Sequence, residues 1–144
     1  MADTPPGAFT VQETSAATGV TVSTLHYWTG PARVITPEIA HPGVQRAPKL
    51  FSSQNLVQIA TLKILSERGL GLDAWQALQQ VARPAWWDLR TADEERLVFL
   101  DGKTWQYYSG SAEEVAVLVG TSLARAQDAV VVNLSTLKRE IRQQ

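Results

Sequence analysis

Two short helical segments on either side of a glycine constrain the fold of this chain more than any other feature. They lie within residues 9–28, FTVQETSAATGVTVSTLHYW. Residues 11–18 have the length of a two-turn helix, and Gly19 stands where a helix C-cap needs a positive φ. Thr21 is placed to cap a second helix over about residues 22–28. Four apolar side chains of the stretch are expected to face inward: Val11, Val20, Leu25 and Trp28. The pattern predicts two short helices joined by a tight turn.

A proline-rich segment, residues 31–51, follows the helix pair. Its four prolines are Pro31, Pro37, Pro42 and Pro48. Short apolar pieces at residues 34–36 and 49–51 bracket a mostly polar tip that includes HPGVQRAP. Proline fits only edge strands and turns, so the segment predicts a loose hairpin, or wing, with short pairing.

Two longer helices are predicted after the wing. Apolar side chains recur at helical spacing over about residues 54–68, with Ser52 or Ser53 as the cap. A second apolar face runs over about residues 72–82, and Pro84 stops that helix.

The last third of the chain changes in composition. Trp86 and Trp87 lie in a connector, and residues 91–94 have the spacing of a capping box for one helical turn. The Asp101-Gly102 pair suits a type I′ hairpin turn. Strands are predicted over residues 96–100, 103–108 and 129–133. Helices are predicted over about 111–119 and 137–144, the last beginning at Ser135, and a short turn or helix is predicted over 124–128. Residues 96–144 therefore predict a small ββαβα module.

Composition excludes several classes of protein. The chain has no cysteine and only two histidines, which rules out disulfides and thiolate metal sites and leaves little for metal catalysis. It has no apolar run near the ~20 residues that span a bilayer, and its N-terminus lacks the regions of a signal peptide. Neither a nucleophile–base arrangement nor a phosphate-binding loop is found. We expect a cytoplasmic protein that is not an enzyme, with no cofactor, no metal and no membrane partner.

The charge balance weighs mildly against nucleic acid as a partner. Net charge is −1 over 144 residues, whereas nucleic-acid-binding domains are usually basic. Residues 1–80 hold five basic and five acidic side chains. Any basic patch must therefore come from the placement of cations and not from their excess.

The first half nevertheless resembles the MerR-type winged helix-turn-helix DNA-binding domain, over about residues 9–81. The matching motifs are Phe-Thr-Val at 9–11, Thr-Gly-Val-Thr at 18–21, Thr-Leu at 24–25, Tyr-Trp at 27–28, Lys-Leu-Phe-Ser at 49–52, Glu-Arg-Gly at 67–69 and Leu-Gly-Leu at 70–72. One motif alone is weak, but their order and spacing together are fairly specific.

Several positions depart from that family. The family usually has Leu where this chain has Thr14 and Ala17, so the first helix packs less bulk. His26 stands in place of a basic residue, and histidine is mostly uncharged at neutral pH. Pro84 and the paired tryptophans replace the long dimerisation helix of the family's regulators, and the family's effector-binding cysteines are absent.

The resemblance implies sequence-specific binding of double-stranded DNA by a transcriptional regulator. The second short helix would enter the major groove and the wing would lie on the phosphate backbone. The expected DNA-binding residues are Thr21, Val22, Ser23, His26, Tyr27, Arg46 and Lys49. With so few cations each copy would bind weakly, so we expect a dimer or higher oligomer, cytoplasmic and associated with the nucleoid.

The expected fold class is α+β, mainly helical, with four segments. They are a disordered lead over residues 1–8, the MerR-like winged-helix domain over 9–83, a Trp-rich connector over 84–95 and the ββαβα module over 96–144. That module would provide self-association. The alternative function is an antitoxin-like or adaptor protein whose C-terminal module binds another protein.

Several aromatic and charged residues allow a plainer interpretation. His26 fits a packing or surface residue, Tyr27 fits a core position, and Arg46 and Lys49 fit ordinary solvated charges. Trp86 and Trp87 favour packing between domains over a ligand pocket. The aromatic hairpin around Trp105 favours a core or a subunit interface over a base-stacking platform, which would need neighbouring cations.

Overall fold

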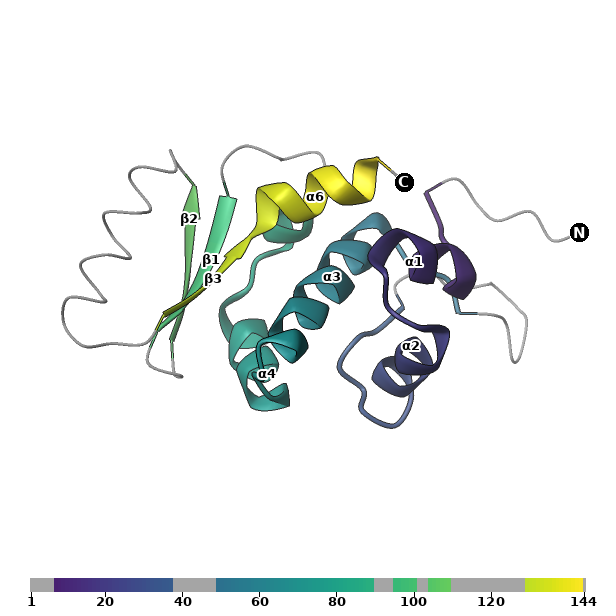
Figure 1. Ribbon diagram of the computed structural model, residues 1–144, viewed down its shortest axis with the longest axis horizontal. Coiled ribbons are helices and arrows are strands. Elements are labelled where there is room, and N and C mark those ends of the chain that lie inside the picture. Colours follow the sequence, from purple (N-terminus) through teal and green to yellow (C-terminus); the bar gives the residue numbers. More distant parts are fainter. Residues whose placement is uncertain (1–6, 38–48, 90–94, 101–103, 110–128, 144) are drawn as a thin grey trace, which may run out of the picture.

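The structure, a computed structural model, describes residues 7–37, 49–89, 95–100, 104–109 and 129–143. The fold is α+β and mainly helical, as the sequence predicts. A long central helix, α3, separates a pair of short helices, α1 and α2, from a small antiparallel sheet (Figure 1). The last helix, α6, runs from the sheet back along α3.

The two short helices form where their caps predict. Helix α1, Val11–Thr18, begins at a capping box in which Thr10 and Glu13 each bind the other's backbone N–H. Gly19 ends it with a φ of 75°, and Thr21 caps α2, Val22–Thr29. The four apolar side chains expected to face inward are all buried. The prediction of two helices joined by a tight turn is confirmed.

The predicted strand at residues 34–36 is wrong, whereas pairing elsewhere within the wing stays a prediction. Residues 34–36 form no strand; instead the backbone N–H groups of Val34 and Ile35 donate to the carbonyl of Trp28. Phe51 forms its antiparallel bridge with Phe9, each N–H donating to the other's carbonyl at 2.9 Å. The base of the wing is therefore tied to the segment before α1. Residues 38–48, the tip, lie outside the described residues.

Helix α3, Ser53–Glu67, is the centre of the molecule. Ser52 caps it through a reciprocal capping box with Asn55, so the helix begins within one residue of the prediction. Its side chains at 56, 57, 59, 62 and 65 are at most 1 % exposed. A helix buried on so much of its surface must be covered by several other elements, and α1, α4 and α6 all pack on it.

Helix α4, Leu72–Val81, and a short 3-10 helix, η1, cover another side of α3. The sequence predicted a plain connector where η1, Pro84–Trp87, forms. Trp86 and Trp87 are buried, and the Trp87 ring lies 6.1 Å from the ring of Trp75 in α4. The packing interpretation of this Trp pair is supported, because both rings belong to the core.

The sheet has the strand order β2-β1-β3. Strand β1, Glu95–Leu100, pairs antiparallel with β2, Thr104–Ser109, and with β3, Ala129–Asn133. All three predicted strands are confirmed to within one residue at each end. The predicted turn at 101–102, the single helical turn at 91–94, the helix at 111–119 and the turn or helix at 124–128 lie outside the described residues.

The final helix begins earlier than predicted. Helix α6 spans Leu134–Arg142, and its cap is Asn133, whose side chain accepts from the Thr136 N–H at 3.1 Å. The sequence placed the start at Ser135, but Asn133, the last residue of β3, suits an N-cap as well as a serine does. Leu137 and Ile141 are buried within this chain, where α6 packs on α3 and β1.

One hydrophobic cluster runs through both predicted domains, from Val11 in α1 to Ile141 in α6. Two indole N–H groups add polar links across it. Trp75 Nε1 donates to the Val34 carbonyl and Trp105 Nε1 donates to the Ala74 carbonyl, both at 2.9 Å. The proposed division at residues 83 and 95 stays a prediction. In the part of the chain that the structure describes, no helix has the length and hydrophobicity needed to cross a membrane.

Candidate nucleic-acid interface

The exposed face of α2 carries the polar residues that the sequence singled out. Ser23, His26 and Tyr27 stand at helical spacing i, i+3 and i+4 and are all exposed. Leu25 and Trp28 anchor the opposite face in the core. Tyr27 is 53 % exposed, so the interpretation of this residue as a core side chain is excluded. The helix therefore presents a hydroxyl, an imidazole and a phenol on one side.

Thr21 and Val22 have mainly structural contacts. The Thr21 hydroxyl accepts from the Thr24 N–H and donates to the Thr24 hydroxyl, which caps α2. Val22 is half-buried and packs against the core. Of the two, Thr21 remains exposed and close to the helix N-terminus, where an anion is electrostatically favoured.

Lys49 lies beside the other end of α2. Its ammonium donates to the hydroxyl of Thr29, the last residue of the helix, at 2.7 Å. A cation is favoured at a helix C-terminus, and the hydrogen bond limits the freedom of a long side chain. The first residue after the wing tip is thus fixed against the second short helix. Arg46 lies outside the described residues.

A shallow depression joins α2 to the start of α1. It has a volume of about 420 Å³ and is lined by Thr10, Val11, Gln12, His26 and Lys49. It combines a lysine, an imidazole and the first backbone N–H groups of a helix, all of which bind phosphate oxygens well. Glu13 lies nearby, but its carboxylate is engaged by the Thr10 N–H at 3.1 Å.

The sequence did not indicate that Thr10 and Gln12 line this depression or that Thr29 binds Lys49 beside it. Thr10 had a readable signal, since residues 10–13, Thr-Val-Gln-Glu, have the spacing of a capping box. Thr29 had none, because its bond to Lys49 joins residues twenty positions apart. The sequence indicated both α2 and the segment at residues 49–51, but it gave no information that the two lie side by side.

The described residues contain no group of three or more His, Asp or Glu side chains that could hold a metal ion. Comparison with protein-family models gave no match, and comparison with curated proteins gave none either. Function is therefore inferred from the geometry of the α1–α2 surface, which is the exposed face of α2 together with the depression beside it.

Proposed function

We propose that this chain binds double-stranded DNA in a sequence-specific manner as a MerR-like winged helix-turn-helix transcriptional regulator. Helix α2 would enter the major groove, and Lys49 at the base of the wing would contact the phosphate backbone. The observation that carries the proposal is the exposed polar face of α2 with Lys49 fixed beside its C-terminal end.

The dimensions of α2 support this role. Its eight residues span about 12 Å, similar to the ~12 Å width of the major groove. Ser23 and His26 both offer hydrogen-bonding groups to base edges, whereas the Tyr27 hydroxyl suits a phosphate oxygen. The capped turn at residues 19–21 holds α2 at a fixed angle to α1, which rests on α3.

The scarcity of cations implies binding by more than one copy. Lys49 is the one cation among the residues that line the depression beside α2. Affinity from phosphate contacts grows with the number of neutralised charges, so a single head with few of them binds weakly. Two or more heads on one DNA would raise the effective affinity without further contacts.

Selection from a library of randomised DNA duplexes tests the proposal. The purified chain should enrich a motif, and Ser23→Ala and His26→Ala should change the preferred bases within it. Lys49→Ala should weaken binding to all sequences similarly and reduce the slope of log affinity against log salt by about 1. Arg46→Ala tests the same role for the wing tip.

Arg139→Ala is the matched control, because Arg139 is an exposed cation on α6, and α6 does not line the depression beside α2. It should leave both the motif and the salt slope unchanged. The proposal fails if the wild-type chain enriches no motif. It also fails if Lys49→Ala and Arg139→Ala have equal effects on DNA affinity.

A further inference from the structure

Helix α2, the element proposed to enter the major groove, depends on one side chain for its charge. Its eight residues, VSTLHYWT, include no Asp, Glu, Lys or Arg. Histidine is the one side chain that ordinarily changes charge between about pH 5 and 8. The helix therefore presents no charge to DNA while the His26 imidazole is neutral, and one positive charge when it is protonated.

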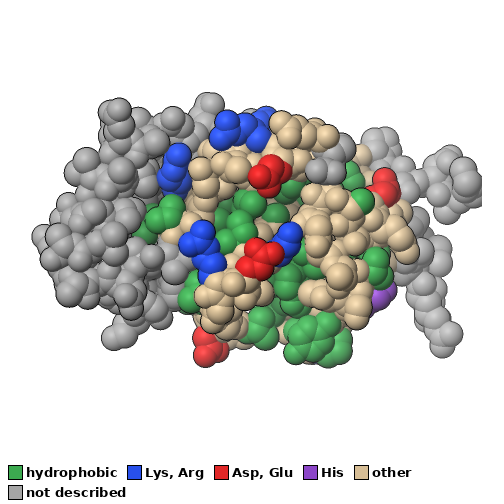
Figure 2. Space-filling model, viewed as in Figure 1, with side chains coloured by type: hydrophobic (Ala, Val, Ile, Leu, Met, Phe, Trp, Pro, Cys, Tyr) green, Lys and Arg blue, Asp and Glu red, His purple; other side chains and the backbone are tan. Residues whose placement is uncertain are grey.

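The His26 side chain lies at the surface and shares a site with Lys49. Both residues line the depression of about 420 Å³ beside α2, and the 2.7 Å hydrogen bond to Thr29 holds the Lys49 ammonium there. Figure 2 shows the histidine among the described residues (purple) at the surface, with no acidic side chain (red) adjoining it on that face. Protonation of His26 would thus add a second cation to the depression.

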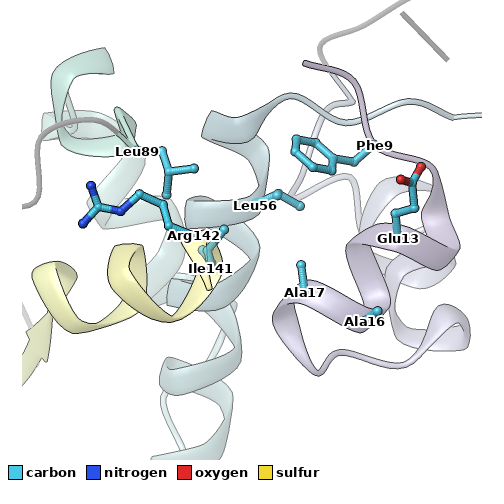
Figure 3. A pocket seen from close by; sticks show the side chains of 8 residues that line it. All are labelled: Phe9, Glu13, Ala16, Ala17, Leu56, Leu89, Ile141 and Arg142. Atoms are coloured by element: carbon cyan, nitrogen blue, oxygen red, sulfur yellow. The ribbon is translucent and has the colours of Figure 1, made fainter. Parts of the chain in front are cut away.

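No carboxylate among the described residues forms an ion pair with His26. Glu13 is the one charged residue of α1, the helix that packs on α2. Its carboxylate accepts from the Thr10 N–H at 3.1 Å, and it lines the apolar cavity of about 490 Å³ between α1 and α6 (Figure 3), not the depression. On α3, Glu67 pairs with Lys63 at 3.7 Å. A charge on the imidazole is therefore available to a DNA phosphate.

The other charged groups around α2 are cations. Lys49 lines the depression, and Arg33 is exposed in the segment that follows the helix. Cations gathered at one site repel each other in the free chain, and a phosphate placed beside them relieves that repulsion. Binding of DNA and binding of a proton by His26 therefore favour each other, as linkage requires of two ligands that attract.

We propose that protonation of His26 strengthens the binding of DNA by this chain, so that affinity rises as the pH falls from about 7.5 to about 5.5. The inference rests on the proposed function, because it concerns the same α1–α2 surface. Both ring nitrogens of the protonated imidazole are N–H donors, which suits phosphate oxygens. One more phosphate contact should steepen the slope of log affinity against log salt by up to about 0.9.

DNA affinity at two pH values tests the inference, on a duplex that carries the motif enriched by the wild type. Fluorescence anisotropy at about pH 7.5 and about pH 5.5, at one ionic strength, should give dissociation constants that differ about three- to tenfold. His26→Gln cannot gain a proton in this range, and its two constants should be equal. His26→Lys is charged at both pH values, so its constants should also be equal, with a steeper salt slope than that of His26→Gln. Each variant is compared with itself, so a changed base preference does not enter the ratio.

His41→Gln is the matched control, because His41 is the other of the two histidines in the chain and lies outside the described residues. It should keep the wild-type ratio. Calorimetry in two buffers of different ionisation enthalpy gives a second readout. The wild type and His41→Gln should take up protons when they bind DNA, and His26→Gln should take up fewer. Circular dichroism at both pH values confirms that each variant is folded.

Two results would overturn the proposal and leave DNA binding in place. One is a wild type that binds its motif with equal affinity at the two pH values. The other is a His26→Gln variant that keeps the wild-type ratio, because another group would then be the one that titrates. A chain that enriches no motif at either pH overturns the proposed function itself, and this inference with it.

Discussion

Helices α1 and α6 pack on the same central helix, but different interactions hold them there. Helix α6 buries Ser135 and Lys138 and also three apolar side chains, Leu134, Leu137 and Ile141, each of which contributes about 1.5–3 kcal/mol when fully buried. The buried residues of α1 are Val11, Thr14 and Thr18, two of which carry hydroxyls. Burial fixes α6, whereas α1 depends more on its caps and on the turn that follows it. The stability of the α1–α2 pair therefore depends most on interactions between residues that are close in the sequence.

The largest effect is expected where burial dominates. Leu134 is fully buried at the start of α6, and Leu134→Ala should lower the free energy of unfolding by about 2–5 kcal/mol, measured by urea denaturation. Leu72, 37 % exposed on α4, gives the comparison, and Leu72→Ala should cost much less. Equal costs for the two leucines would show that α6 is not held by burial.

The turn between α1 and α2 should give the next largest effect. Gly19 has a φ of 75°, and a Cβ there would lie 2.9 Å from the Lys63 Nζ, so Gly19→Ala should cost about 1–2 kcal/mol. Gly69 has a φ of 76° with nothing within 4 Å of a Cβ, so Gly69→Ala isolates the backbone cost. Gly71→Ala, at a negative φ with open space, should be nearly neutral. If Gly19→Ala is also neutral in urea denaturation, the turn does not set the position of α2.

The caps of the two short helices should contribute about equally. Thr10→Ala and Thr21→Ala each remove a hydroxyl that accepts a backbone N–H, at 3.1 and 3.2 Å, and each should cost about 1 kcal/mol. Ser23→Ala, an exposed change on α2, should stay within about 0.5 kcal/mol. Thermal unfolding followed by circular dichroism separates these values. If Thr10→Ala and Thr21→Ala cost no more than Ser23→Ala, the stability of the α1–α2 pair does not depend on its caps.

The smallest effect should have the opposite sign. The buried Thr14 hydroxyl makes no hydrogen bond among the described residues, so Thr14→Val should raise the free energy of unfolding by about 0.5–1 kcal/mol. Thr61 is buried too, but its hydroxyl donates to the Val57 carbonyl at 2.8 Å, and Thr61→Val should destabilise the chain. A stabilising Thr14→Val beside a destabilising Thr61→Val would show that only the Thr61 hydroxyl contributes a hydrogen bond. If both substitutions lower the free energy of unfolding, the hydroxyl of Thr14 has a hydrogen-bond partner.

Elements with a complete local signal were predicted correctly. Gly19 and Thr21 marked the turn, and the apolar spacing of α3 marked its length to within a residue. The strands β1 and β2 followed from the residues around a hairpin signal. The strand expected at residues 34–36 does not form, because the N–H groups of Val34 and Ile35 donate to the Trp28 carbonyl although these β-branched residues favour a strand. That competition depends on the position of α2, which no local pattern encodes.

The candidate surfaces divide in the same way. The sequence indicated Ser23 and His26 as exposed candidates on α2, but it left Tyr27 open between core and surface, and Val22, another candidate, is half-buried. The sequence carried no sign of three other features, since each depends on segments far apart in the chain. They are the bond between Lys49 and Thr29, the burial of Lys138 on α6 and the apolar cavity between α1 and α6.

The sequence by itself determined where most helices and strands begin and end, because caps, glycines and apolar periodicity act over a few residues. It also indicated that Leu25 and Trp28 of α2 face the core. The tertiary structure decided that α1 and α6 lie on one helix with an apolar cavity between them. It also decided that Phe51 pairs with Phe9, which lies far from it in the chain. These choices depend on which surfaces bury most together, and that free energy belongs to the folded chain as a whole.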